Sequence, residues 1–489
     1  LHYSRLLRSV SGPDISPVDH TNLVGDLAAK LPEQPDDVTY IFPLKPNVTF
    51  HNKPPLSGRK ATARDFVATW EVFKTKSQNA ATFTGVVDRV EAPDDQTVKF
   101  TLKEAYAPFL TTHASTPEGI WLIPVETIES GQVQTDPVGT GPWIFRQWEK
   151  GVALRWDRNP NYFDSPMPYF SRVEASLNND PQRILAGLQA GDLDWSGLSG
   201  TVFEEAKKKL DPKGKDLFVP TGVLGTFYFN FDVKPWGDKR VRQALSMALD
   251  RDGYLKIQDQ TGKGDWHSHL SPALAPFYMS PKNAKQEFGP NAKYFEKNIA
   301  EAKALLAAAG LPDGLTFKLW ANVDRYGAAA KQSWELFAQT IGEAGFKAEL
   351  VFQEYGAYIQ STYLGKISEG AGVGPLIGAP RDPDDIFFRL FASVSPRHNW
   401  GGTPIPEMGD LDARFVKQRQ ILDLQERIAE IKELQRVMAE SMLVVPYHAA
   451  GGYGYVQPWV QNYNDKSGYG VHVESIAKAW FTDERIRKG

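Results

Sequence analysis

Apolar positions in the segment 225–256 change from a strand-like to a helix-like spacing within a few residues. Residues 226–231 are rich in aromatic side chains, which is typical of a β-strand. A polar break follows, in which Asp238 is placed to accept the first free N–H groups of a helix. Beyond it, apolar residues recur with helical spacing at Val241, Ala244, Leu245, Ala248 and Leu249. The pattern predicts a strand, a tight turn and a capped amphipathic helix.

Two further pairs of short apolar stretches predict β-hairpins. Residues 87–92 and 97–102 lie on either side of an acidic turn, and both stretches favour strands. Residues 39–44 and 48–50 are separated by a Lys-Pro-Asn turn at 45–47 and predict a second pair. Both hairpins belong to the first third of the chain.

Helices are predicted wherever a capping residue precedes an apolar stripe, because a side-chain oxygen can accept the free N–H groups of the first turn. The predicted caps are Thr62 with Asp65, Asp180, and Asn298 with Glu301. Two more helices are predicted over 333–342 and 422–443, and two strands over 315–320 and 346–352. Strands and helices alternate through the second half of the chain, which favours an α/β sheet.

Composition narrows the functional classes. The 489 residues carry 55 basic and 59 acidic side chains, a formal net charge of −4, so nothing favours nucleic acid as a partner. Hydrophobic residues make up 42% and charged residues 23%, a balance typical of globular proteins. Cysteine is absent, which excludes disulfides, thiolate metal sites and a cysteine nucleophile within these residues.

Several segments also resemble the family-five extracellular solute-binding proteins of ABC importers, whose best-known members bind oligopeptides and dipeptides. The resemblance lies in the residues of these segments and in the order of the segments along nearly the whole chain. The segments are 137–163 with Gly139 and Gly141, 173–198, 225–256, 297–314 and 374–391.

The resemblance implies an α/β, two-lobed fold like that of periplasmic binding proteins of class II, or cluster C, with mixed sheets and helices. Lobe one would comprise 1–228 and 447–489, with an extra subdomain at about 38–158. Lobe two would comprise 229–446. The chain would cross between them near 229–232 and 446–448.

The same resemblance implies a ligand trap and not an enzyme. The protein would bind a small molecule, close by a hinge motion and deliver it to a membrane ABC permease. We expect a monomer that needs no cofactor and no metal. The expected location is periplasmic, or extracellular and anchored to the membrane as a lipoprotein. No export signal is present in the chain, which opens at Leu1, so we expect any such signal to lie upstream.

The loop 374–391 bears on the ligand. In peptide-binding members of the family an aspartate here pairs with the peptide ammonium, and the matching position in this sequence is Ala379, with Leu376 at a usual tryptophan position. A buried ammonium without an anion is costly. We therefore expect a non-standard peptide, an opine or an oligosaccharide rather than a simple peptide. Asp382 is an alternative anion for the ammonium, and its other interpretation, shared with Asp384, is capping of a helix that begins near Ile386.

Candidate binding residues fall in three groups. Arg381 is a candidate anion anchor, because a guanidinium offers a rigid fork to a carboxylate or phosphate. Aromatic side chains are candidates for stacking on a sugar ring, with packing in the core as the alternative for each. Trp400 stands out among them because its neighbours are polar and glycine-rich. The complete set of candidates is Trp400, Arg381, Asn399, Asp382, Tyr447, His448, Tyr228, Phe229, Trp195, Trp320 and Tyr355.

Two other interpretations remain open from sequence. His267 and His269 are two residues apart, with Asp265 beside them, so a metal site there competes with a simple polar loop. A glycoside hydrolase needs only two suitably spaced carboxyl groups, which 59 acidic residues cannot exclude. No nucleophile elbow, zinc-protease motif or phosphate loop is present in the sequence.

Overall fold

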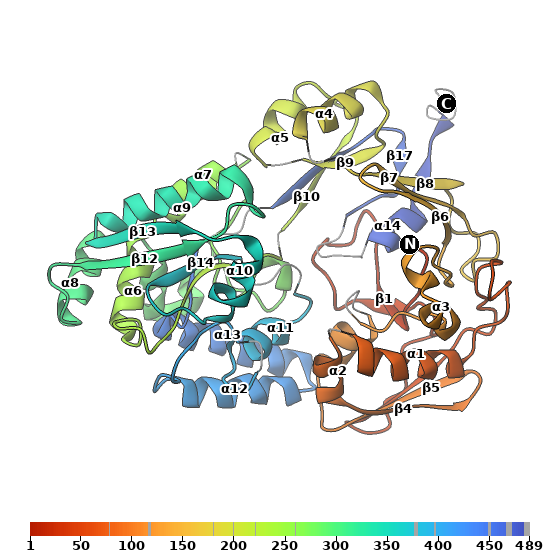
Figure 1. Cartoon of the computed structure of the whole chain (residues 1–489), viewed down its shortest axis with the longest axis horizontal. Helices are drawn as coiled ribbons and strands as arrows, with labels where there is room; N and C mark the ends of the chain where they lie inside the picture. Colours follow the sequence, from red (N-terminus) through yellow and green to blue (C-terminus); the bar gives the residue numbers. More distant parts are fainter. Residues whose placement is uncertain are drawn as a thin grey trace. The chain divides into compact units, whose positions relative to one another are not determined.

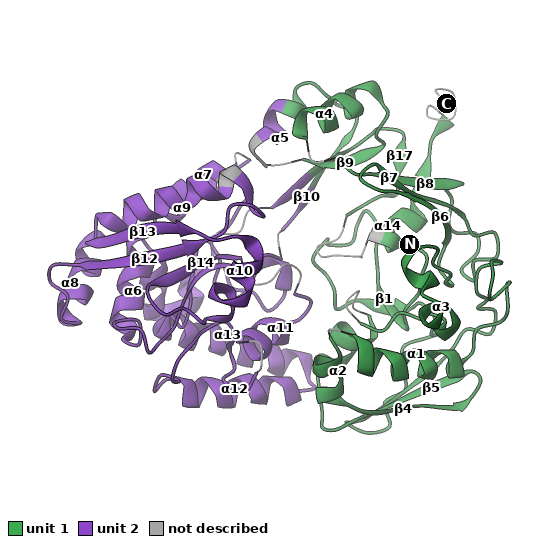
Figure 2. Cartoon of the chain, in the orientation of Figure 1, with its two compact units in different colours: residues 1–198, 206–217, 454–489 green, residues 199–205, 218–453 purple. Residues whose placement is uncertain are grey.

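The computed structural model describes residues 1–77, 79–115, 119–178, 180–198, 200–220, 222–259, 261–375, 380–395, 398–447, 451–465 and 472–483. These residues form two compact units (Figure 2). Unit 1 consists of 1–198, 206–217 and 454–489, and unit 2 of 199–205 and 218–453. Among the described residues, no helix combines the length and the apolar character that crossing a bilayer requires.

Unit 2 is built on one mixed sheet with the strand order β13-β12-β14-β11-β15. Figure 1 labels β12, β13 and β14 of this sheet. β12 runs parallel to β13 and β14, whereas β11 runs antiparallel to both β14 and β15. β15 therefore points in the same direction as β14. The bounds of the strands are β11 Gly225–Phe229, β12 Leu315–Ala321, β13 Phe346–Phe352, β14 Ala371–Pro375 and β15 Val445–Pro446.

Helices pack on this sheet and enclose the largest hydrophobic core of the described chain. α9 packs on β13, and α6 packs on β15 and on α8. The helical segments of unit 2 are α6 Lys239–Ala248, α7 Arg251–Gln258, η3 Pro272–Leu274, η4 Lys285–Phe295, α8 Ile299–Ala308, α9 Gly327–Gly342, α10 Tyr355–Gln360, η5 Thr362–Leu364, α11 Asp384–Ile386, η6 Phe387–Phe391, α12 Met408–Gln420 and α13 Leu424–Ser441.

The predicted helix caps of unit 2 are confirmed. The Asp238 carboxylate accepts the N–H of Arg240 at the start of α6. The Asn298 side chain likewise accepts the N–H of Glu301 at the start of α8. The predicted helix 422–443 corresponds to α13, which begins after Asp423. Each cap is local, since donor and acceptor are two or three residues apart, and this explains why the sequence alone identifies them.

Two buried arginines explain why charged residues occur within the apolar segment that follows β11. Arg242 donates to the carbonyls of Ser441 and Met442 at the end of α13, and to Trp236 O. Arg251 donates to Pro446 O on β15, and to Ser246 O and Phe295 O. Its fourth described partner is the Ser246 hydroxyl, so no carboxylate contacts this guanidinium among the described hydrogen bonds. Burial lowers the pKa of Arg251 to about 9.

β15 is an edge strand of this sheet, and side chains cover its outer side. His269 Nε2 lies 3.1 Å from Val444 O, and Arg251 Nη2 lies 2.8 Å from Pro446 O. Covering an edge in this way satisfies carbonyls that would otherwise remain free for another strand. The two side chains thus fix the backbone that leads into Tyr447.

Unit 1 contains smaller antiparallel sheets. β3 (Thr39–Pro43), β5 (Thr97–Leu102) and β4 (Val87–Asp94) form one sheet in the order β3-β5-β4. A second sheet has the order β6-β7-β8, with bounds β6 Trp143–Glu149, β7 Ala153–Arg158 and β8 Arg172–Ser176. Two short pairs of strands also belong to unit 1: β1 Leu7–Ser9 pairs with β2 Leu23–Gly25, and β17 Val460–Gln461 pairs with β18 Trp480–Phe481. The remaining strands of the chain form a sheet in the order β10-β16-β9, with bounds β10 Lys215–Val219, β16 Gly452–Val456 and β9 Trp195–Leu198.

The helices in and beside unit 1 are shorter. Thr62 and Asp65 form the predicted capping box of α1, and Asp180 caps α4 as expected. The helical segments are α1 Ala63–Lys76, α2 Ala80–Val86, η1 Leu110–Ala114, α3 Val125–Glu129, η2 Gln132–Gln134, α4 Pro181–Ala190, α5 Gly200–Lys207 and α14 His472–Lys478.

One predicted hairpin is confirmed and the other is wrong. β4 and β5 pair as residues 87–92 and 97–102 predict. Residues 48–50 instead make only an isolated bridge, between Thr49 and Lys60, and β3 takes β5 as its partner. The Leu44 N–H, just after β3, donates to Gln96 O, just before β5. The pairing of β3 with β5 therefore extends beyond the strands, and residues 48–50 take no part in it. A partner that is distant in sequence displaced the local one.

Close backbone approach explains Gly139 and Gly141 in the segment 137–163. A Cβ on Gly139 would lie 1.9 Å from His2 O, and one on Gly141 would lie 2.6 Å from Leu1 O. The His51 ring holds the same turn from the other side. Its Nε2 lies 3.0 Å from Gly141 O, and its Nδ1 accepts the Gly139 N–H at 3.3 Å. This arrangement requires a neutral imidazole, because a protonated Nδ1 cannot accept a hydrogen bond.

Buried histidines make stability depend on pH. Burial lowers the pKa of His51 to about 4 and those of His267 and His269 to about 3. An unfolded histidine titrates near 6.5, so the unfolded chain binds more protons below that pH, and stability falls as the pH drops below about 6.5. We expect the free energy of unfolding to decrease between pH 7.5 and pH 5 by as much as about 2 kcal/mol for each buried histidine.

Urea unfolding at the two pH values measures this decrease. His51→Gln should flatten the pH dependence by the share of that one histidine. A free energy of unfolding that is equal at pH 7.5 and pH 5 would contradict the neutral, buried state of these three rings.

Candidate ligand-binding site

The ends of four strands define one edge of the unit 2 sheet. β12, β13, β14 and β15 all point the same way, so their carboxyl ends meet at this edge. In open α/β sheets, ligands bind outside the carboxyl ends of the strands. The loops that follow here begin with Asn322, Gln353 and Tyr447. Asn322 Nδ2 donates to Gln353 O at 2.8 Å, which fastens the first two loops to each other.

Tyrosines from separate elements gather at this edge. Tyr326 immediately precedes α9, and its ring centroid lies 6.1 Å from that of Tyr355 and 6.4 Å from that of Tyr358, both on α10. Beneath them, the hydroxyl of Tyr358 contacts that of Tyr228 on β11. Tyr355 is 36% exposed, whereas Tyr228 and Tyr358 are buried. The edge tyrosines, defined as Tyr228, Tyr326, Tyr355 and Tyr358, thus run from solvent into the core.

Glycines on β14 make room for the buried members of this set. A Cβ on Gly372 would lie 2.3 Å from the Tyr228 ring, and one on Gly374 would lie 2.2 Å from the Tyr358 hydroxyl. Gly225 on β11 similarly accommodates the Tyr447 ring, at 2.3 Å from the position of a Cβ. The small residues of these strands therefore place large phenol rings against the sheet.

Electrostatics keeps the phenols protonated. Burial raises the pKa values of Tyr228, Tyr358 and Tyr447 well above 10, and that of Tyr326 is raised for the same reason. At physiological pH these side chains are neutral donors and acceptors. Such a surface suits a neutral group with a flat apolar face and hydroxyls, and it supplies no charge to balance an ammonium.

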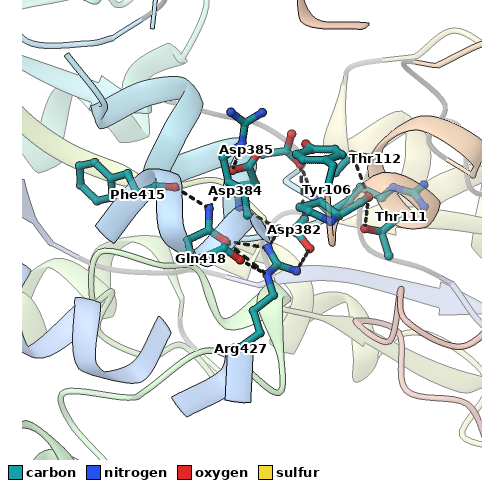
Figure 3. Close-up of polar contacts among 12 residues, drawn as sticks. Tyr106, Thr111, Thr112, Asp382, Asp384, Asp385, Phe415, Gln418 and Arg427 are labelled. Carbon is teal, nitrogen blue, oxygen red and sulfur yellow. Dashed lines mark hydrogen bonds and ion pairs between the residues drawn. The ribbon is translucent and has the colours of Figure 1, made fainter. Parts of the chain in front are cut away.

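The carboxylate of Asp382 is already paired within unit 2. Arg427 on α13 donates to both of its oxygens, and one of these bonds, from Nη1 to Oδ2, measures 2.8 Å (Figure 3). Gln418 on α12 accepts from Arg427 through Oε1 and donates to Asp384 Oδ1 at 2.8 Å. Asp382 Oδ1 also accepts the Asp384 N–H, whereas Asp384 does not cap α11, because it is that helix's first residue.

Of the remaining charges of the segment 380–395, Arg381 is buried, whereas Asp385 and Arg389 are half-buried. Arg381 is 5% exposed, and its backbone N–H donates to Asp385 Oδ2 at 2.9 Å. Burial raises the pKa of Asp385 to about 7, although Arg389 opposes the shift. The predicted ammonium position, Ala379, and Leu376 lie outside the described residues, as does His448.

Trp400 lies in the core of unit 2. It is 1% exposed, its ring packs on Phe231, and its indole N–H donates to Phe391 O at 2.8 Å. The neighbouring Asn399 is also buried and donates through Nδ2 to Tyr363 O. These contacts explain both side chains by packing, without a ligand. The surrounding glycines are needed for close approach, since a Cβ on Gly401 would lie 1.9 Å from Gly365 O.

The other candidates are spread over both units. Phe229 stacks on Trp236 in the core of unit 2, with centroids 4.7 Å apart. Trp320 is partly buried and donates to Glu369 O at 2.9 Å. Trp195 belongs to unit 1, where it packs on Tyr463. Among the candidates, the structure therefore brings Tyr228 and Tyr355 into one cluster, with Tyr447 on the same sheet edge.

Sequence reasoning missed Tyr326 and Tyr358. A signal for both was present. Tyr355 and Tyr358 are three residues apart, which places them on one face of a helix. Tyr326 follows the predicted strand 315–320, and Tyr355 follows the predicted strand 346–352. Where two such strands run parallel, the residues that follow them lie at the same edge of the sheet.

The pair His267 and His269 serves packing. His269 bonds to Val444 O, immediately before β15, and both rings are fully buried. Asp265 accepts from the hydroxyls of Tyr278 and Ser280. Within the described part of the chain, no group of three or more metal-ligating side chains is placed to hold an ion.

Comparison with known proteins identifies the family. A model of the bacterial extracellular solute-binding proteins, family 5 Middle, matches residues 22–391. The chain belongs to this family. Heme-binding protein A of Haemophilus influenzae is 26% identical, over 96% of this chain and 87% of that protein. The dipeptide-binding protein of Escherichia coli is 27% identical, over 77% of this chain and 71% of that protein.

Solved structures agree on the fold. HbpA2 of Haemophilus parasuis superposes with a TM-score of 0.78 at 22% identity, covering 98% of this chain and 94% of the other. The binding protein AgaA of A. tumefacien R10, solved with agropinic acid, gives a TM-score of 0.76 at 20% identity, with 98% and 93% covered. The fold is thus the two-lobed, mixed α/β fold of periplasmic binding proteins. Nothing in these comparisons favours the glycoside hydrolase alternative.

Proposed function

We propose that this family-5 protein is the extracytoplasmic solute-binding component of an ABC importer, and that it hands its ligand, chemically unchanged, to a membrane permease. Membership of the family supports this role. We place the lobes at 1–228 with 447–489 and at 229–446, and we propose that ligand binding closes the hinge between them. We further propose a monomer, located in the periplasm or anchored outside the cell as a lipoprotein.

The ligand we propose is an opine or an oligosaccharide, or a non-standard peptide, rather than a simple peptide. The edge tyrosines carry this proposal. They are neutral, they combine ring faces with hydroxyls, and Tyr355 and Tyr326 are the members open to solvent. Asp382, the acidic residue that is nearest in sequence to the predicted ammonium position, is paired with Arg427. A protein of the same fold, AgaA, was solved with agropinic acid, and this supports an opine as one of the proposed ligands.

Calorimetry with opines, oligosaccharides and dipeptides tests the ligand class. We expect saturable, stoichiometric binding of a sugar-containing compound, a rise in melting temperature with ligand, and no turnover. Conversion of the bound compound into product would end the proposal of a carrier, whereas tight binding of simple dipeptides would end only the proposed ligand class.

Tyr355→Ala should weaken affinity for such a ligand about tenfold, roughly 1.4 kcal/mol, because a stacking face is lost. Melting of the unliganded protein should change little, since Tyr355 is partly exposed. Tyr294→Ala serves as a control, because Tyr294 is not one of the edge tyrosines. It belongs to η4, which packs on α6 and α13. Equal affinity in the two variants would remove Tyr355 from the site.

A further inference from the structure

A small cavity with polar side chains in its lining lies within unit 1. Its volume is about 20 Å³. Residues from the N-terminal segment, from four separate loops and from α14 line it. Figure 2 labels α14 and β1 within unit 1. The polar and charged side chains of the lining are Tyr3, Ser4, Arg5, Arg8, Asp26, Trp121, Tyr162 and Glu474.

A buried ion pair faces this cavity with part of its hydrogen-bonding capacity unused. Arg5 pairs with Glu474 through Nη2, and both side chains are almost fully buried. Arg5 Nε and Nη1 and Glu474 Oε2 have no hydrogen-bond partner among the described residues. The hydroxyls of Tyr3 and Ser4 are likewise buried and unpartnered there. Two donors, one acceptor and two hydroxyls therefore surround one space.

Leaving such groups unsatisfied is expensive. A buried polar atom without a partner costs about 1–3 kcal/mol, and more when it is charged. Buried ion pairs are favourable only when further hydrogen bonds satisfy their remaining donors and acceptors. The Trp121 ring, 4.5 Å from the Arg5 guanidinium carbon, supplies a π face but accepts no conventional hydrogen bond from Nε or Nη1.

Charge and size select the occupant. The charged side chains of the lining are two guanidiniums, Arg5 and Arg8, and two carboxylates, Glu474 and Asp26, so their formal charges cancel. A further ion would upset this balance in a buried space, so the occupant is neutral. A cavity needs roughly 10–15 Å³ to hold one water molecule and two to four polar partners to retain it. About 20 Å³ suits a single water and is too small for a larger solute.

We propose that this cavity is a binding site for one ordered water molecule, which bridges Arg5 and Glu474 and hydrogen-bonds to the hydroxyls of Tyr3 or Ser4. The water accepts from an Arg5 N–H and donates to Glu474 Oε2. It thereby completes the ion pair that joins the N-terminal segment to α14. The water is a structural part of unit 1, and this inference is independent of the proposed ligand.

A crystal structure of the unchanged protein tests the site directly. We expect one well-ordered water within about 3.2 Å of an Arg5 nitrogen and of Glu474 Oε2. An empty cavity, a bound ion or a side chain in this position would each overturn the proposal.

Magnetic relaxation dispersion, which counts long-lived waters in solution, gives a second test. The double variant Arg5→Met with Glu474→Leu makes the lining more apolar, and apolar cavities stay dry. We expect it to hold one long-lived water fewer than the unchanged protein. The control is Arg155→Met with Glu174→Leu, which removes an exposed pair of the same unit and should leave the count unchanged. An unchanged count in the Arg5 variant would contradict the bridging water.

Discussion

Arg251→Met should lower the free energy of unfolding by at least about 3 kcal/mol. Arg251 is 1% exposed and donates to the carbonyls of Ser246, Phe295 and Pro446 and to the Ser246 hydroxyl. Methionine fills much of the volume but donates nothing, so three buried carbonyls lose a charged donor. Loss of a hydrogen bond that leaves a buried group unsatisfied costs about 1–3 kcal/mol. The outer side of β15 would also lose one of the two side chains that cover it.

Urea unfolding of the unliganded protein measures this loss. Arg240→Met is the matched control, because Arg240 lies near the start of the preceding helix and pairs with Asp238 at the surface. An exposed pair contributes at most about 1 kcal/mol. Equal losses in the two variants would mean that the carbonyls around Arg251 find other partners, and the structural role assigned to this arginine would be wrong.

The second large effect is expected at the pair Asp382 and Arg427. Asp382→Ala or Arg427→Met alone should each lower the free energy of unfolding by about 3–5 kcal/mol, because each leaves the opposite charge buried without its partner. The double variant should cost far less than the sum of the two. Both side chains are about 5% exposed or less, so solvent cannot replace the missing charge.

A double-mutant cycle measured by urea unfolding isolates the interaction between the two residues. Lys318 and Glu369, an exposed pair of the same unit, provide the comparison and should couple by at most about 1 kcal/mol. Additive losses at Asp382 and Arg427 would show that their ion pair contributes nothing. If Asp382→Ala kept its stability, Arg427 would not need this carboxylate. In the unchanged protein the Asp382 carboxylate would then be available to a ligand's ammonium.

Local features of the chain could be predicted because their causes are local. Asp238 and Asn298 satisfy N–H groups two or three residues away, so the sequence contains both partners of each bond. The strand 346–352 and the hairpin 87–102 follow from apolar spacing in the same way. The pairing of 39–44 with 48–50 failed because the true partner of β3 is β5, more than fifty residues further along.

The candidate site was predicted only in part, because burial is a property of the packed molecule. Trp400 has polar and glycine neighbours in sequence, yet these glycines let a second backbone segment approach and cover it. Arg427 and Asp382 are 45 residues apart, and the sequence of neither segment indicates that the two side chains pair. Tyr326 belongs to the candidate site only because Tyr355 and Tyr358 contact it from α10.

The sequence by itself determined the family, the alternation of strands and helices, and the capped ends of the helices. These depend on residue types at short spacing and on the order of motifs along the chain. Only the tertiary structure decided which aromatic side chains remain open to solvent, which carboxylates already have a cation, and where charged groups surround unfilled space. Each of these is fixed by segments that meet through packing, and their distance along the chain carries no information about the meeting.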